Sequence, residues 1–327
     1  MAPHTPDVDA TGMTDVSDEM ADFLEGVPDG ETIDLLPFGF YRMDKTWAFT
    51  DRQDITVLGH GATIGTDVTG DRNRSHVRLR GCRNIRIRDL GIEGANPTAG
   101  SAGPFVSELA GQHGIEIQGS VGVEVGPRVW ITDVYGDFVY MGWYDKVLSD
   151  WIHIHECTFV RSGRQGVTLI GARVVAIDDC VIAEARRSTI DLEPHPGAGV
   201  LAVRIARNLC FRGRLNFVAA HGKGPVDWVT VMGNRLEGMA LGIDVEDKDG
   251  GRRKNWRVLD NTSTLPSGSP RGSTMRFKRV DSVIVRDNTQ PMKPNREMYL
   301  VGIDDCTDVT VADNELGPNA DGQWRNL

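Results

Sequence analysis

Two short segments of the chain carry carboxylates in a spacing that suits acid–base chemistry. The segment TIDLEP contains Asp191 and Glu193, and the segment GIDVED contains Asp244 and Glu246. In a β-strand, residues i and i+2 point to the same face about 6.5–7 Å apart, so each segment would present two carboxyl groups side by side. Two carboxyl groups at this separation can act as general acid and general base in the cleavage of a glycosidic bond. Asp191, Glu193 and Asp244 are therefore the candidate catalytic residues.

Basic and polar residues near these carboxylates would tune them or bind a substrate. Arg164 and Gln165 begin a strand-like segment, GVTLIG, that precedes Asp191 by one repeat, and His221 lies one repeat after it. An Arg164 guanidinium over Asp191 would keep that carboxylate ionised, which would leave Glu193 as the protonated acid. His221 is a candidate acid, base or sugar ligand. The alternative is a solvated acidic stripe, whose charges lie outside only because the inside is apolar.

These residues need a rigid element to bring them together, and the repeats of the sequence predict one. Seven phrases alternate apolar and polar residues, as a strand with one buried face does. Their last residues are separated by 23, 28, 26, 27, 27 and 26 positions, a period typical of a solenoid. With no helical pattern between the copies, the repeats predict an all-β, right-handed, single-stranded parallel β-helix of about 9–10 coils. The phrases are IHIHEC (152–157), VAIDDC (175–180), VRIARN (203–208), VTVMGN (229–234), WRVLDN (256–261), VIVRDN (283–288) and VTVADN (309–314).

The last residue of each phrase predicts a buried ladder. Five of the phrases end in Asn, whose amide can bond the backbone and the Asn of the neighbouring coil. Cys157 and Cys180 end the other two and would fill the same slot as small apolar residues.

A second strand series precedes the first in each coil and would place the candidate site. If its apolar residues point inward, the residues between them form outward columns on one sheet. Asp191 and Asp244 then lie two coils apart, about 9–10 Å, at the upper edge of the separation found in inverting glycosidases. The first column reads Glu116, Tyr140, Thr168, Asp191, Ala219, Asp244 and Arg276, and the second reads Gln118, Gly142, Ile170, Glu193, His221, Glu246 and Lys278.

The ends of the chain have their own patterns. Apolar residues within 13–27 are spaced for one face of a short helix, with Thr14 and Ser17 as candidate N-caps, and this helix would plug the open end of the solenoid. We expect an N-terminal segment with this capping helix and the first strands over 1–50, the parallel β-helix over 51–316, and a polar tail over 317–327.

Composition limits the partners. A net charge of −10 argues against nucleic acid or an anionic membrane as a general partner. The sequence shows neither a secretory signal pattern nor a membrane-spanning apolar run, and its five Cys follow no metal-binding spacing. His153 and His155 alternate outward, but without an evident third ligand they indicate a solvated face. We expect no metal and no cofactor.

Several segments resemble the pectate-lyase-like superfamily of right-handed parallel β-helices. The run VPDGETIDLLPFGFYRMDKT followed by ITVLGHGATI is similar to the usual start of that fold. The segments QHGIEIQG, VYGDFVYMG, GRQGVTLIG and STIDLEPHP are similar to β-helix tail proteins of phages that infect actinobacteria.

The resemblance implies action on, or binding of, a bacterial cell-surface polysaccharide, in a virion tail assembled without a secretory signal and often as a homotrimer. The positions that match the tail-protein segments form an implied glycan site: His113, Glu116, Asp137, Arg164, Gln165, Asp191 and Glu193. The chain departs from the polygalacturonase pattern, because AHG stands where GHG is expected, and it lacks the acidic triad and Arg base of pectate lyases. Pectin is therefore a poor candidate substrate.

Two functions compete at this stage. In the first, Asp191, Glu193 and Asp244 hydrolyse a glycan, while Tyr140 and the other site residues hold the sugar. A lyase, with His221 or Tyr140 as proton abstractor, is a variant of this function. In the second, the protein is a non-catalytic structural or receptor-binding virion protein that binds glycan and contacts other tail proteins.

Overall fold

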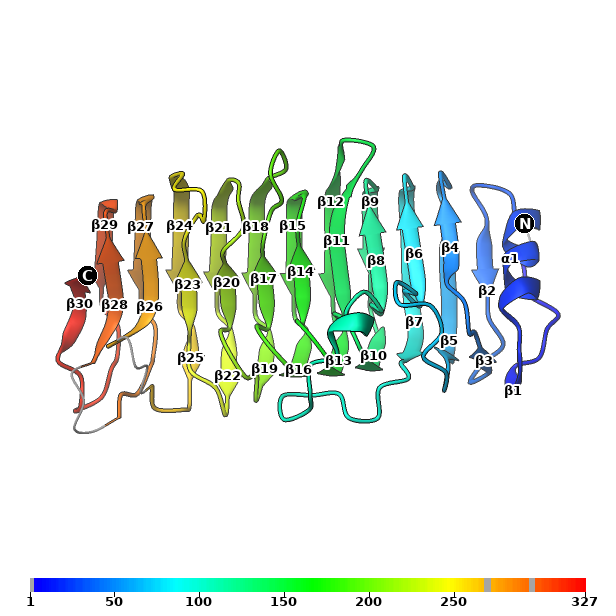
Figure 1. Cartoon of the computed structure of the whole chain (residues 1–327), viewed down its shortest axis with the longest axis horizontal. Helices are drawn as coiled ribbons and strands as arrows, with labels where there is room; N and C mark the ends of the chain where they lie inside the picture. Colours follow the sequence, from blue (N-terminus) through cyan, green and yellow to red (C-terminus); the bar gives the residue numbers. More distant parts are fainter. Residues whose placement is uncertain (1–2, 268–271, 294–297) are drawn as a thin grey trace.

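Each coil of the chain contributes short strands to three parallel sheets, and the stacked coils form a right-handed parallel β-helix of about 11 turns (Figure 1). The computed structural model describes residues 3–267, 272–293 and 298–327. The predicted fold class is confirmed. The prediction of about 9–10 coils was slightly low, because strands at both ends of the chain add to the stack.

The first sheet carries the predicted outward columns. Its strands run parallel from coil to coil, and among the described residues only the hairpin between β11 and β12 adds an antiparallel pair. The strands are β4 (Trp47–Thr50), β6 (Val77–Arg80), β8 (Ile115–Gln118), β11 (Val139–Tyr144), β14 (Val167–Leu169), β17 (Ile190–Leu192), β20 (Val218–Ala220), β23 (Ile243–Val245), β26 (Ser273–Lys278), β28 (Tyr299–Asp304) and β30 (Gly322–Asn326).

The second sheet contains the repeated phrases that end in Asn or Cys. Its strands are β2 (Thr32–Asp34), the first part of β5 (Thr56–Gly65) and of β7 (Arg83–Glu93), β9 (Val121–Val125), β12 (Val147–His155), β15 (Ala172–Asp178), β18 (Val200–Ala206), β21 (Val226–Met232), β24 (Arg253–Leu259), β27 (Val280–Arg286) and β29 (Thr307–Ala312).

The third sheet closes each coil. It consists of β1 (Thr11–Asp15), β3 (Phe40–Arg42), the last parts of β5 and β7, β10 (Trp130–Val134), β13 (Thr158–Ser162), β16 (Val181–Ala185), β19 (Leu209–Phe211), β22 (Arg235–Glu237) and β25 (Thr262–Ser263). The buried apolar residues of all three sheets form one continuous core.

A helix covers the N-terminal end of this core, as predicted. Helix α1 (Ser17–Gly26) packs against β4 and buries Met20 and Leu24. Residues 13–15, which the apolar spacing assigned to the helix, belong to β1 instead. The predicted N-caps are wrong: Val16 occupies the cap position without a side-chain hydrogen bond, and the Asp15 carboxylate accepts from the Ser17 backbone N–H at 3.0 Å.

Strand pairing joins residues on the two sides of each expected segment boundary. β2 and β3 lie within residues 1–50, yet both pair with β5 and so belong to the stack. β30 lies within residues 317–327 and pairs in parallel with β28. No helix in the described ranges is long and apolar enough to cross a membrane.

The predicted Asn ladder is confirmed and runs along the second sheet. In each of its steps, the side-chain Nδ2 and the backbone N–H of one Asn donate to Oδ1 of the next Asn along the chain; between Asn261 and Asn288 the distances are 2.9 and 3.0 Å. Cys157 and Cys180 occupy the same slot in earlier coils and are buried. At the other end, Gln323 accepts a hydrogen bond from Asn314 Nδ2 at 2.9 Å and closes the column. The five members are Asn208, Asn234, Asn261, Asn288 and Asn314.

Replacing the central Asn261 by Ala tests how far the stack depends on this column. The substitution leaves two buried donors of Asn234 without their acceptor, so we expect a loss of about 2–4 kcal/mol in the free energy of unfolding. Chemical denaturation followed by circular dichroism measures it. Asp260→Asn, an exposed change in the same turn that suits its left-handed backbone (φ 54°), is the control, and equal stability of the two variants would contradict the role of the ladder.

Candidate functional site

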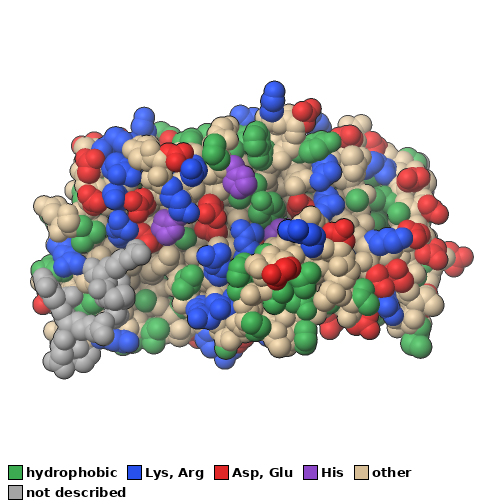
Figure 2. All heavy atoms as spheres, in the orientation of Figure 1, with side chains coloured by type: hydrophobic (Ala, Val, Ile, Leu, Met, Phe, Trp, Pro, Cys, Tyr) green, Lys and Arg blue, Asp and Glu red, His purple; other side chains and the backbone are tan. Residues whose placement is uncertain are grey.

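The first outward column of the first sheet is present as predicted. Register pairs link Glu116 to Tyr140, Thr168 to Asp191, and Asp191 through Ala219 to Asp244. These side chains do not form a solvated stripe, because Glu116, Asp191 and Asp244 are only 8%, 3% and 7% exposed. On the face drawn in Figure 2, basic, acidic and histidine side chains alternate along the length of the solenoid.

A pocket of about 340 Å³ lies over the N-terminal part of this column. Glu116 sits in its wall with both oxygens bonded: Oε2 accepts from Arg78 Nε at 2.6 Å and from the Ser75 hydroxyl at 2.7 Å, and Oε1 accepts from Gln118 Nε2 at 2.6 Å. The loop that contains the short helix η1 (Ser107–Leu109) forms one side. The lining residues are Asn73, Arg78, Ala110, Gly111, His113, Glu116, Gln118, Tyr140 and Arg164.

Tyr140 forms the floor of this pocket. Its ring stacks on His113, with centroids 4.4 Å apart and planes 6° from parallel, and the Arg164 guanidinium lies 6.0 Å from its centroid. His113 Nδ1 accepts the Asp137 backbone N–H at 3.0 Å, so a neutral His113 carries its proton on Nε2. Burial lowers the pKa of His113 and raises the pKa of Tyr140 to about 12.

Asp137 is the buried carboxylate that holds Arg164 and the backbone of Gln165 in place in the central part of the site. It has no exposed surface, and its carboxylate accepts from Arg164 Nη1 at 3.0 Å and from the Gln165 backbone N–H at 2.8 Å. The sequence analysis placed Asp137 among the substrate-binding residues, but a side chain without exposed surface would act on a substrate only by positioning Arg164. The ion pair raises the pKa of Arg164.

Gln165 connects Asp137 to Asp191 through hydrogen bonds. Its Oε1 accepts the Ser188 backbone N–H at 2.7 Å, which directs its Nε2 toward Asp191 Oδ2 at 2.8 Å. Burial raises the pKa of Asp191 to about 7, and Glu193 and Asp137 nearby add to the shift. The prediction that Arg164 keeps Asp191 ionised is therefore wrong, because Arg164 pairs with Asp137 instead.

Glu193, the other carboxyl group of this strand segment, lies beside a cation. Its Oε1 lies 3.2 Å from Lys248 Nζ in an ion pair, the contact that an ionised carboxylate makes. The roles suggested by the sequence are thus exchanged: Asp191 is the carboxyl group with the raised pKa, and Glu193 is the one paired with a cation.

A second and larger pocket, of about 540 Å³, lies over the C-terminal part of the column. Asp244 is its central acid, with Oδ2 3.2 Å from His221 Nε2 and Oδ1 3.8 Å from Arg276 Nη1. Asn216 and Lys293 add polar groups to its lining. Asp191 and Gln165 lie between the two pockets and line neither of them.

Three contributions were missed by sequence reasoning. Arg78 occupies the outward column one coil before Glu116, so extending the column back by one strand would have found it. The other two are Arg186 and Arg187, which precede β17: Arg186 donates to the Gly103 carbonyl, and Arg187 lies 5.6 Å from the Phe105 ring centroid. They fix the long loop beside the first pocket, a contact across more than 80 residues that no local pattern reveals.

No group of His, Cys, Asp and Glu in the described part of the chain is placed to hold a metal ion. His153 and His155 stack on each other on the second sheet, each beside a carboxylate. Tyr144 is 40% exposed at the β11–β12 hairpin and lies under Arg80, outside both pockets.

Neither a protein-family model nor a curated protein sequence matches the chain. Three solved structures illustrate what it resembles. PfbA, a surface adhesin of Streptococcus pneumoniae, has a TM-score of 0.70 at 11% identity, over 98% of this chain and 91% of the adhesin. Endo-xylogalacturonan hydrolase from Aspergillus tubingensis has a TM-score of 0.66 at 11% identity, over 100% and 95% of the two chains. A tailspike variant of E. coli bacteriophage HK620, in complex with a pentasaccharide, has a TM-score of 0.64 at 10% identity, over 98% of this chain and 62% of the tailspike.

At such identities the likeness concerns the fold, and it confirms the predicted pectate-lyase-like β-helix. An adhesin, a hydrolase and a tailspike share this fold, so the fold alone does not select among binding, cleavage and attachment.

The raised pKa of Asp191 can be tested through stability. An unfolded Asp titrates near 3.9, so the folded protein holds the extra proton between that value and about 7. Relative to Asp191→Asn, the wild type should lose a few kcal/mol in the free energy of unfolding as the pH rises through this window. Above this window, the difference between the two proteins should no longer change. Denaturant melts from pH 4 to 8 measure the difference.

Asp179→Asn is the matched control on the other side of the solenoid. The pKa of Asp179 is lowered by its bond to Arg207, so its contribution should be lost as the pH falls, which is the opposite sign. If the stability of the wild type and the stability of Asp191→Asn changed with pH in the same way, this result would contradict the raised pKa of Asp191.

Proposed function

We propose that the protein binds a polysaccharide of a bacterial cell surface along the first sheet and hydrolyses it with Asp191 as general acid. The observation that carries this proposal is a buried carboxyl group, Asp191, whose pKa is raised to about 7, two coils from a second carboxylate, Asp244, that lies beside His221 and Arg276. Two carboxyl groups whose surroundings differ in this way are the usual sign of an acid and base pair.

The geometry supports an inverting reaction. Asp191 would give its proton to the glycosidic oxygen as the bond to the anomeric carbon breaks. Asp244, held by His221 and Arg276, would take a proton from the water that forms the new bond on the opposite face of the sugar. Ala219 lies between them in the column, and its small side chain leaves room at the centre. Two coil spacings of about 4.8 Å give a separation near 9–10 Å, at the upper end for inversion.

The first pocket would hold neighbouring sugars of the chain. Tyr140 offers a flat ring fixed by His113, and Arg164 and Arg78 supply guanidinium donors held in place by Asp137 and Glu116. Side chains fixed before the substrate arrives lose little conformational entropy on binding. The hydrolase among the structural neighbours, and the tailspike with its bound pentasaccharide, support a glycan as the ligand class.

One observation favours a second candidate, a receptor-binding protein that does not cleave its glycan. Asp191 is 3% exposed and lines neither pocket, so a ligand could occupy both pockets without contact with that carboxyl group. PfbA, a surface adhesin, supports this candidate. A lyase with Tyr140 as its base is disfavoured, because a pKa of about 12 leaves almost no phenolate at neutral pH.

Incubation of the purified protein with bacterial capsular and cell-wall polysaccharides, including those of actinobacteria, separates these candidates. New reducing ends without ultraviolet absorbance from unsaturated sugars would establish hydrolysis. Both signals together would indicate a lyase. Binding without either signal would establish the receptor-binding protein.

Substitutions at the two carboxyl groups test the roles proposed for them. Asp191→Asn and Asp244→Asn should each lower kcat by about 10²–10⁴-fold, because each removes one proton-transfer group, while polysaccharide binding stays near that of the wild type. Glu124→Gln, on the second sheet, is the control. A hydrolase that keeps its kcat in Asp191→Asn would rule out Asp191 as the acid.

The pH dependence of kcat/KM gives an independent test. Activity that needs protonated Asp191 should fall tenfold per pH unit above a pH of about 7. A flat alkaline limb up to pH 9 would contradict this assignment.

A further inference from the structure

A row of apolar residues follows one corner of the solenoid, at the start of the second sheet. In every coil from β7 to β29, a residue near the start of this sheet's strand has a left-handed backbone and bends the strand. In four consecutive coils that residue is apolar, and we call these four the tryptophan ridge: Trp151, Val174, Ala202 and Trp228. The residues of the other coils are Asn84, Gly122, Asn255, Ser282 and Asp308.

The residue types on the ridge do not suit its backbone. Gly, Asn and Asp tolerate positive φ, whereas a bulky side chain in this region is an outlier. Trp151 and Trp228 have φ values of 55° and 61°. They gain no burial in return, because they are 66% and 60% exposed. Two tryptophans that are unfavourable in backbone conformation and left in water do not serve the stability of the fold.

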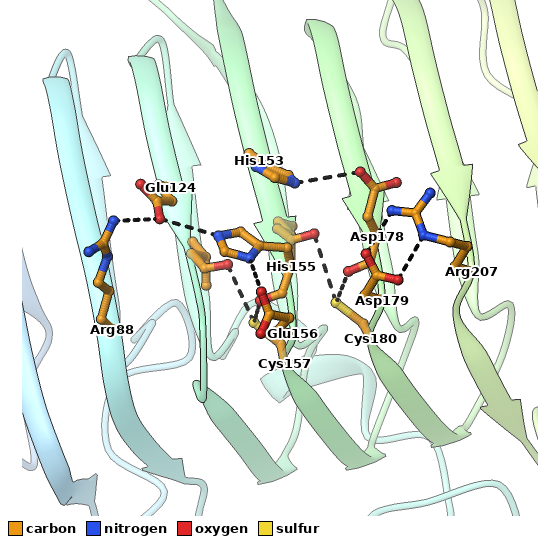
Figure 3. Close-up of polar contacts among 12 residues, drawn as sticks. Arg88, Glu124, His153, His155, Glu156, Cys157, Asp178, Asp179, Cys180 and Arg207 are labelled. Carbon is orange, nitrogen blue, oxygen red and sulfur yellow. Dashed lines mark hydrogen bonds and ion pairs between the residues drawn. The ribbon is translucent and has the colours of Figure 1, made fainter.

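A polar group lies on β12, β15 and β18, three of the strands that carry the ridge, and Figure 3 shows two of its members, His153 and Asp178. His153 Nε2 lies 3.5 Å from Asp178 Oδ2, and Arg204 donates to the same carboxylate. His153 and Arg204 are about half exposed, whereas Asp178 is 2% exposed. Asp178 Oδ1 has no hydrogen-bond partner among the described residues, although it is buried. A buried oxygen without a donor, on a carboxylate that lies between the half-exposed His153 and Arg204, indicates a place where a ligand completes the bonding.

The surrounding charges are balanced. His153 stacks on His155 with centroids 4.3 Å apart, and His155 lies 3.2 Å from Glu124 (Figure 3). Next to the rings, Arg173 pairs with Asp150, which also accepts the Trp151 backbone N–H. The surface therefore presents flat rings and many hydrogen-bonding groups.

We propose that the tryptophan ridge, with His153 and Arg204, is a second binding site for a polysaccharide chain, on a different sheet from the site proposed above. The two tryptophans are three coils apart, about 14–15 Å along the axis, so an extended chain parallel to the axis would contact both. The indole rings stack on the apolar faces of two sugars, and hydroxyl groups of the sugars between them bond His153 and Arg204. The site would hold the protein on its polymer while the first sheet acts on another part of the same chain.

The ridge fits a glycan better than a protein partner. A stable protein interface buries about 800 Å² on each side around a continuous apolar core. Here the two large rings are separated by the small side chains of Val174 and Ala202 and are flanked by ion pairs. A chain of sugars needs separate flat rings with hydrogen-bonding groups between them.

The test replaces both tryptophans by a residue that suits the backbone. Trp151→Asn/Trp228→Asn removes the rings and should leave the thermal stability equal or higher, because Asn tolerates positive φ. Binding to a printed array of bacterial capsular and cell-wall polysaccharides, with dextran as the neutral member, should weaken at least about tenfold. Ser282→Asn, at the same corner position two coils beyond Trp228, is the matched control and should bind as the wild type.

Two measurements distinguish a failure of this second binding site from a failure of the site proposed on the first sheet. The double variant should keep the wild-type kcat on short oligosaccharides that span only the first sheet, whereas Asp191→Asn should keep its array binding. Equal array binding by wild type and double variant, or no binding by the wild type to any polysaccharide on the array, would overturn the proposal. A wild-type dimer that dissociates in the double variant, measured by analytical ultracentrifugation at unchanged glycan binding, would also overturn it and assign the ridge to a second copy of the chain.

Discussion

Everything on the surface of this molecule depends on the register in which its coils stack. A slip of one residue in any coil would exchange the inward and outward side chains of that strand. The Asn ladder opposes such a slip, because each Asn bonds the equivalent Asn of the next coil through both its backbone N–H and its side-chain Nδ2. These groups are buried, so a shifted coil would leave donors and acceptors unsatisfied away from water. The ladder therefore fixes the columns of the first sheet, although it lies on the second.

The same stacking explains why two buried aspartates on the first sheet have different surroundings. Asp137 receives the Arg164 guanidinium and a backbone N–H, which is enough to hold a carboxylate away from water. Asp191 lies one coil beyond the Arg164 strand and receives only the neutral amide of Gln165, with Glu193 on the same face. Burial raises the pKa of Asp191, and Arg164, which pairs directly with Asp137, does not make the direct ion pair that would offset this shift. The different surroundings of Asp137 and Asp191 thus follow from which of the two carboxyl groups Arg164 contacts.

The sequence predicted what depends on period and alternation. The fold, the Asn ladder and the outward column from Glu116 to Arg276 follow from strand periodicity repeated in each coil, and the capping helix follows from the helical spacing of apolar residues near the N-terminus. It did not predict which acid pairs with Arg164, because residues 137, 164 and 191 are adjacent only across coils and a side chain can reach either neighbour. It also missed the loop that Arg186 fixes beside the first pocket, because that contact joins residues 83 positions apart in the chain. The exposure of Trp151 and Trp228 could not be predicted for another reason. Each tryptophan directly precedes an alternating phrase, IHIHEC or VTVMGN, and the bend at that position leaves no mark in an alternating pattern.

The corner positions of the solenoid tolerate a wider range of residue types than the strand positions of its sheets do. On the sheets, an inward residue must fit the core and an outward residue must fit its two column neighbours, so a change in one coil is felt in the next. Left-handed corner residues such as Trp151 and Trp228 extend into solvent, and Asn, Asp, Ser, Gly, Ala, Val and Trp all occur at this corner. A large side chain there costs local backbone energy but does not disturb the register. A solenoid can therefore carry one surface built from coupled, buried groups and another built from independent exposed ones, and the first sheet and the tryptophan ridge are of these two kinds.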